Sequence, residues 1–152
     1  MNPNMVSYSS SYGRAEFHVC FKVKYCHRIF SYEKIKNRCK EIFFEVAKKH
    51  NIIIKEIGFD KDHVHMILLL NPSMSISAAS KLLKGTSGCM LLREFPYMKS
   101  TYFWDSGLWS PMIYFDSVGQ TGQDPERIAN YVRNQGITKF HWFYTSGSLK
   151  LV

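Results

Sequence analysis

The sequence has few cysteines, and none of them is spaced as in a zinc finger. Cys20, Cys26, Cys39 and Cys89 form no C-x-x-C pair, which argues against a structural zinc module. The sequence also lacks a recognisable secretory signal. We therefore expect reduced thiols rather than disulfides.

Long hydrophobic runs are missing as well. The longest run, residues 66–70, is far shorter than the roughly 20 residues that cross a bilayer. Residues 1–13 are rich in Ser and Tyr and have no apolar core, so we expect a flexible N-terminal tail rather than a targeting peptide. We expect a cytoplasmic protein without membrane contact, with one domain at residues 14–136 and a C-terminal tail at residues 137–152.

Acidic residues are the minority among the charged ones. The 152-residue chain has 20 Lys and Arg against 12 Asp and Glu, a formal net charge of +8. Such a surplus is in the range of nucleic-acid-binding proteins. Because basic charge also serves solubility alone, it favours a nucleic-acid partner only slightly.

Hydrophobic periodicity predicts alternating strands and helices. The expected elements are a strand at 17–24, a helix from the N-cap Ser31 to about residue 50, strands at 52–59 and 62–70, a helix from about Ser75 to Glu94, a loop at 97–107, and a strand within 108–118. This β-α-β-β-α-β order is typical of the ferredoxin-like, or RRM-like, α+β sandwich with an antiparallel sheet. A glycine-containing joint then leads to a C-terminal helix that begins at Asp124.

Two histidines share one face of a predicted strand. His63 and His65 are two residues apart, so both point away from the apolar side. Asp60 and Asp62 could hydrogen-bond their ring nitrogens or simply cap the turn. Strand histidines are more often structural than metal-binding, so this pair is a weak signal by itself. With an oxygen ligand it would suit Mg²⁺ or Mn²⁺.

A second polar pair lies on the predicted C-terminal helix. Tyr131 and Gln135 are four residues apart and therefore lie on one face. The Gln135 oxygen could complete a metal site, and the Tyr131 phenol is a candidate nucleophile that would form a phosphotyrosine link. A single tyrosine among nine can equally be a packing residue.

Several basic and aromatic side chains are candidates for DNA contacts. Cations neutralise phosphates, and exposed aromatic rings stack on unpaired bases. Each candidate could instead be a solvated or a core side chain. The candidates are His18, Lys22, Lys24, Arg28, Lys81, Lys84, Trp109 and Arg127.

The His-Val-His strand followed by a Tyr-x-x-x-Gln helix resembles the single-tyrosine HUH transposases of the insertion-sequence 200/605 class. The matching stretches are 17–28, 62–70, 82–87, 108–119 and 131–135. The resemblance implies that His63, His65 and Gln135 bind Mg²⁺ or Mn²⁺ and that Tyr131 is the nucleophile. Arg133 departs from the family pattern, which has an acidic residue there.

The same resemblance implies a DNA transposase that cleaves and rejoins single strands at element ends and recognises DNA hairpins. It also implies a homodimer in which the tyrosine helix of one subunit completes the histidine site of the other. The nearest alternatives are a replication-type nickase and a domesticated, repeat-associated relative.

Two further alternatives differ in chemistry. A small metal-dependent phosphoesterase would use an activated water in place of the phenol. A non-catalytic RNA-binding module could use the same sandwich, although such a platform needs aromatic residues where the histidines stand.

Overall fold

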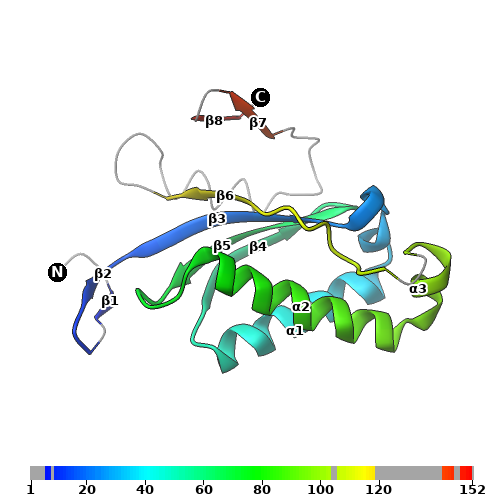
Figure 1. Ribbon diagram of the computed structural model, residues 1–152, viewed down its shortest axis with the longest axis horizontal. Helices are drawn as coiled ribbons and strands as arrows, with labels where there is room; N and C mark the ends of the chain where they lie inside the picture. Colours follow the sequence, from blue (N-terminus) through cyan, green and yellow to red (C-terminus); the bar gives the residue numbers. More distant parts are fainter. Residues whose placement is uncertain (1–5, 8, 104–105, 119–141, 146–147, 152) are drawn as a thin grey trace.

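The computed structural model describes residues 6–7, 9–103, 106–118, 142–145 and 148–151. Its elements are β1 (Val6–Ser7), β2 (Tyr12–Gly13), β3 (Ala15–Lys22), the 3-10 turns η1 (Lys24–Cys26) and η2 (Ile29–Ser31), α1 (Glu33–Lys49), β4 (Ile53–Phe59), β5 (His63–Leu70), α2 (Ile76–Glu94), α3 (Pro96–Thr101), β6 (Tyr114–Ser117), β7 (Trp142–Thr145) and β8 (Ser148–Leu151). Figure 1 shows the main sheet with α1 and α2 packed on one of its faces.

The main sheet has four antiparallel strands in the order β4-β5-β3-β6. The central pair, β3 and β5, is aligned so that Lys22 lies opposite His63 and Cys20 lies opposite His65. Together with α1 and α2, these strands follow the β-α-β-β-α-β order along the chain. The predicted ferredoxin-like sandwich is therefore confirmed.

The core lies between the sheet and the two long helices. Alternate residues of the central strands face the helices and are almost completely buried, as a period of two requires. The strands contribute Val19, Phe21, Val64, Met66, Leu68 and Leu70, and α1 contributes Ile35, Cys39, Ile42, Phe43 and Val46. The other sheet face is consequently the one that carries the histidine pair.

The two long helices begin close to the predicted positions. Ser75 is the N-cap of α2, and its hydroxyl accepts a hydrogen bond from the backbone N–H of Ala78 at 3.0 Å, as such caps do. The predicted N-cap of α1, Ser31, is wrong by one residue. Ser31 belongs to the turn η2, so the helix is entered through Tyr32 instead.

The segment after α2 is partly helical rather than a loop. Pro96 is the first residue of α3, where its fixed φ and missing N–H are well tolerated. The predicted loop at 97–107 is wrong in its first part for this reason. The predicted strand within 108–118 is confirmed as β6.

The stretch predicted as an N-terminal tail contains β1 and β2, which pair with each other.

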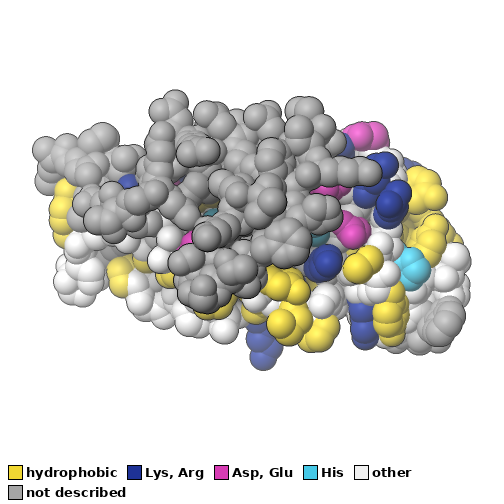
Figure 2. All heavy atoms as spheres, turned by 90° about the horizontal axis from the view of Figure 1, so that it is seen from above, with side chains coloured by type: hydrophobic (Ala, Val, Ile, Leu, Met, Phe, Trp, Pro, Cys, Tyr) yellow, Lys and Arg dark blue, Asp and Glu magenta, His cyan; other side chains and the backbone are white. Residues whose placement is uncertain are grey.

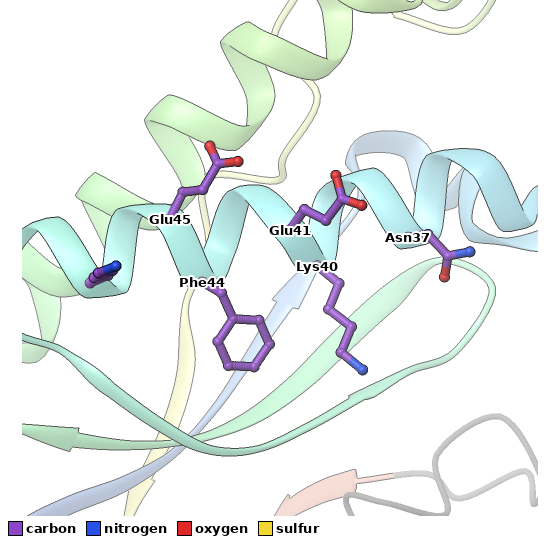
Figure 3. A pocket seen from close by; sticks show the side chains of 6 residues that line it. Asn37, Lys40, Glu41, Phe44 and Glu45 are labelled. Atoms are coloured by element: carbon purple, nitrogen blue, oxygen red, sulfur yellow. The ribbon is translucent and has the colours of Figure 1, made fainter.

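The helical layer has a charged outer surface. Arg38 on α1 lies 2.8 Å from Glu94 of α2 and 3.1 Å from Glu41, although exposed pairs of this kind contribute little stability. Figure 3 shows a shallow pocket beside them, lined by Asn37, Lys40, Glu41, Phe44, Glu45 and Lys48. This pocket is on the helical layer and not on the face with the histidines.

In the part of the chain that the structure describes, no helix is long and apolar enough to cross a membrane.

Candidate functional site

His63 stands at the start of β5 and is held by the turn before it. Its Nδ1 lies 2.7 Å from an Asp62 carboxylate oxygen, and its Nε2 lies 3.9 Å from Asp60. The hydrogen bond to His63 lowers the pKa of Asp62. Asp60 also caps the turn, because its carboxylate accepts from the Lys61 N–H at 2.7 Å. The expected contact between an aspartate and the His63 ring is present, and so is the turn cap.

His65 lies on the sheet face that points away from the helices and is fully buried. Its Nδ1 lies 3.1 Å from Nε2 of His18 on the neighbouring strand. The two rings are stacked at 7° with centroids 5.2 Å apart. Burial lowers the pKa of His18 to about 4 and places the pKa of His65 well below its usual value. Both rings are therefore neutral near pH 7, so one nitrogen of the contact donates the proton and the other accepts it.

Cys20 lies beside the same ring. Its sulfur is 3.8 Å from His65 Nε2. Burial raises the pKa of the Cys20 thiol to about 12. The side chain is consequently a protonated thiol at neutral pH and not a thiolate ligand.

The histidine pair has the chemistry of a partial metal site. The ring centroids of His63 and His65 are 4.8 Å apart, and neutral imidazole is the form that binds a cation. Nδ1 of His63 contacts Asp62 and Nδ1 of His65 contacts His18, while Nε2 of His65 also lies 3.8 Å from the Cys20 sulfur. Neighbours that fix the ring orientation in this way are typical of metal-binding histidines. Among the described residues, no group of three or more His, Cys, Asp or Glu side chains could hold a metal ion. The pair therefore needs another ligand.

The predicted residues of the C-terminal helix cannot be placed. Tyr131, Gln135 and Arg127 lie outside the described residues, so their roles remain predictions.

His18 is buried, whereas a residue that contacts DNA must be exposed. We expected it to contact DNA, but it is only 6% exposed and its ring packs on His65. The strand period placed His18 on the correct face. It could not show that the paired strand β5 would bring another imidazole against it.

Trp109 is a core residue and not an exposed stacking platform. It is 8% exposed, and its indole lies about 6 Å from the rings of Phe21, Phe30 and Phe43. The indole N–H donates to the hydroxyl of Ser87 on α2 at 2.9 Å. The prediction that Trp109 contacts DNA is therefore wrong, because the start of the 108–118 segment packs inward.

Lys84 is also engaged inside the protein. Its ammonium group donates to the backbone oxygens of Ser110 and Met112 at 2.6 and 3.2 Å, and partial burial lowers its pKa. Lys84 thus ties α2 to the segment that precedes β6. Of the other predicted DNA contacts, Lys81 and Arg28 are exposed, and Lys22 and Lys24 are partly buried.

Sequence reasoning missed the aromatic residues that follow β3. Tyr25 and Tyr32 are 62% and 53% exposed. A usable signal was present, since Lys24-Tyr25 and His27-Arg28 alternate basic and ring-bearing side chains directly after a strand.

Comparison with known proteins gives matches over most of the chain. A family model described as IS200-like transposase matches residues 11–135. The transposase for insertion sequence element IS200 of Salmonella typhimurium is 32% identical over 124 residues, covering 79% of this chain and 76% of the relative. The ISDra2 transposase TnpA of Deinococcus radiodurans is 27% identical over 120 residues, covering 79% and 83%.

Two solved structures share the fold. A transposase from Deinococcus radiodurans R1 has a TM-score of 0.69 at 24% identity, over 87% of this chain and 98% of that one. A REP-associated tyrosine transposase bound to a REP hairpin has a TM-score of 0.58 at 12% identity, over 84% and 70%.

The contrast between Lys84 and Lys81 gives a test of the two roles a lysine can have here. We expect Lys84→Met to lower the free energy of unfolding by about 1–2 kcal/mol, because the part-buried Ser110 carbonyl and the exposed Met112 carbonyl lose a charged donor. Lys81→Met should change it by less than about 0.5 kcal/mol, as for other exposed sites. Urea denaturation measures both. Equal stabilities of the two variants would contradict the bracing role of Lys84.

Proposed function

The chain belongs to the family of IS200-like transposases, and we propose that it cleaves and rejoins single-stranded DNA at element ends through Tyr131. The observation that carries this proposal is the histidine pair on the sheet face that points away from the helices. His63 and His65 lie next to each other there, and each is oriented by a hydrogen-bonding neighbour. Such preorganised imidazoles suit a phosphate-cleaving site.

The proposed reaction exchanges one phosphoester bond for another. The Tyr131 oxygen attacks the phosphorus and the bond from phosphorus to the 3′ oxygen breaks, so the leaving strand takes up a proton as a free 3′-hydroxyl. The protein then holds the 5′ phosphate. In the second step a 3′-hydroxyl attacks the phosphotyrosine, and the phenol regains its proton. Because the number of phosphoester bonds is conserved, no nucleotide cofactor is required.

A divalent cation, Mg²⁺ or Mn²⁺, would be held by His63, His65 and Gln135. When bound, such an ion would neutralise charge on the phosphate and favour ionisation of the phenol, whose usual pKa is about 10. The residues around the pair have matching tasks. Asp62 orients the ring of His63, and His18 orients the ring of His65.

The proposed substrate is single-stranded DNA with hairpin ends. The net charge of +8 suits such a partner, and the REP-associated neighbour is a transposase solved with a hairpin. We further propose a cytoplasmic homodimer in which the tyrosine helix of each subunit completes the histidine site of its partner.

Replacing the nucleophile separates this proposal from its rivals. With end-labelled hairpin DNA and Mn²⁺, the parent protein should form a covalent protein–DNA species, visible on a denaturing gel. Tyr131→Phe should abolish that species and keep hairpin binding. Tyr12→Phe, at an exposed position, serves as the matched control. Cleavage that survives in Tyr131→Phe would instead indicate a water-dependent phosphoesterase.

Mixed subunits test how the site is assembled. His65→Ala and Tyr131→Phe proteins should each be inactive alone. After the two are mixed and allowed to exchange subunits, part of the strand-cleavage activity should return, because one composite site per dimer then has all its groups. Activity that stays absent, with subunit exchange demonstrated by differently tagged copies, would show that each site is built within one chain.

The orienting role of His18 predicts an effect on metal affinity. We expect His18→Leu to weaken Mn²⁺ binding by about 10- to 100-fold, as for other residues that hold a metal-binding histidine. Calorimetric titration of the Tyr131→Phe protein measures this without any cleavage. His18→Gln, which keeps an acceptor near the former Nε2, should recover most of the affinity. A folded His18→Leu protein with parental affinity would exclude the role.

A further inference from the structure

Exposed aromatic and basic side chains gather at the end of the molecule that follows β3. We call this group the tyrosine patch, and it consists of Lys24, Tyr25, His27, Arg28, Tyr32 and Tyr97. Tyr25, Tyr32 and Tyr97 are 62%, 53% and 51% exposed. In Figure 2, hydrophobic, basic and histidine side chains lie together at this end, with acidic side chains beside them, where Figure 1 places α3 and the segment between β3 and α1.

The rings of the patch are supported from below. His27 packs edge-on against Tyr25, with centroids 6.0 Å apart, and against the buried Phe103 at 5.5 Å. Tyr102 lies 5.0 Å from the His27 ring. The exposed rings are therefore anchored to the core through a second layer of aromatic side chains.

The backbone under Tyr25 is strained in a way that favours exposure of its ring. Tyr25 and Cys26 have φ values of 60° and 55°, in the left-handed region that bulky residues rarely adopt. A glycine would adopt this conformation without strain. Such strain tends to occur at functional sites, and here it holds a large aromatic ring in solvent.

Cations accompany the rings of the patch. The Lys24 ammonium lies 5.5 Å from the centroid of the Tyr25 ring, and Arg28 is exposed. Exposed rings beside cations are the combination that binds single-stranded nucleic acid, with bases stacked on the rings and phosphates held by the cations. Paired bases could not stack in this way because their faces are covered within the duplex.

The patch is joined directly to the histidine site. The Val23 N–H donates to the Asp62 carbonyl at 2.8 Å, and the Phe30 N–H donates to the Lys61 carbonyl at 3.0 Å. Both ends of the segment that carries Tyr25 are therefore tied to the turn before His63. The patch and the histidine site therefore share the turn at residues 60–62.

We propose that the tyrosine patch binds the unpaired nucleotides next to the cleaved phosphate, with Tyr25 as the stacking platform and Lys24 and Arg28 as phosphate contacts. This inference rests on the proposed function, because it assumes that single-stranded DNA occupies the histidine site. It assigns to the segment after β3 a role in holding the substrate, separate from hairpin recognition.

The test measures binding without chemistry. The Tyr131→Phe protein is titrated, in the presence of EDTA, into a fluorescent oligothymidylate of about 12 nucleotides, within the usual range of single-strand sites. Tyr25→Gly should weaken binding about 5- to 100-fold, the effect expected for loss of one stacked base. Tyr25→Trp should retain binding. Tyr12→Ala is the matched control, since Tyr12 is 51% exposed and lies in β2 at the opposite end of the molecule (Figure 1).

Two controls make the result specific. The thermal midpoint of Tyr25→Gly should equal or exceed that of the parent, because glycine removes the strain at φ 60°, so weaker binding would not reflect unfolding. An abasic strand of the same length should bind Tyr25→Gly and the parent alike, whereas Arg28→Gln should weaken binding to both strands.

Unchanged oligothymidylate binding by Tyr25→Gly would overturn the proposal. Unchanged DNA binding together with altered sedimentation of the variant would identify the patch as a contact between protein chains. Because the assay lacks both the nucleophile and the metal, failure of the proposed cleavage chemistry would leave this result intact, and the two failures can be told apart.

Discussion

The pairing of β3 with β5 is the constraint on which the rest of the site depends. Its register sets Cys20 opposite His65 and Lys22 opposite His63, so four side chains with polar or ionisable groups share one face. A shift of β5 by one residue against β3 would turn His63 and His65 toward the helices. The register is fixed by the opposite face, where Phe21 and Val64 are fully buried. Hydrophobic packing on one side of the sheet thereby sets the chemistry on the other.

The same pairing explains the protonation state of the site. His65 lies on β5, between β4 and β3, and has no exposed surface, so burial disfavours its charged form. The ring of His65 contacts His18 and Cys20, both of which are uncharged at neutral pH. His63 is different, because the Asp62 carboxylate contacts its ring. One member of the pair is thus kept neutral by burial, and the other is oriented by a charge.

Both the histidine pair and the tyrosine patch lie where strands end, on segments fixed by the same turn. The turn at residues 60–62 orients His63 through its carboxylates and fixes the segment after β3 through its carbonyl groups. The two groups of residues are therefore joined through backbone hydrogen bonds rather than through long flexible side chains. Under the proposed function, such a connection would keep a bound strand in a constant position relative to the imidazoles.

Local pattern was sufficient for the order of the elements and for the face of each strand. A period of two places His63 and His65 on the side opposite Val64 and Met66. The hydroxyl of Ser75, which can accept a capping hydrogen bond, marks the start of α2. These features depend on neighbours within a few residues, and the sequence contains those neighbours. The family resemblance rests on the same short stretches.

Only the tertiary structure decided which polar and aromatic side chains are exposed. Trp109 bonds to a residue 22 positions away, Lys84 to one 26 positions away, and His18 to one 47 positions away. The periodicity of nearby residues does not indicate contacts with such distant partners. Trp109, Lys84 and His18 were therefore expected on the surface, but they are engaged inside the protein. Tyr25 is the opposite case, because its exposure follows from a left-handed backbone that propensity does not predict. The sequence by itself determined the sheet face that carries the site, and the packing of distant segments determined which residues reach it.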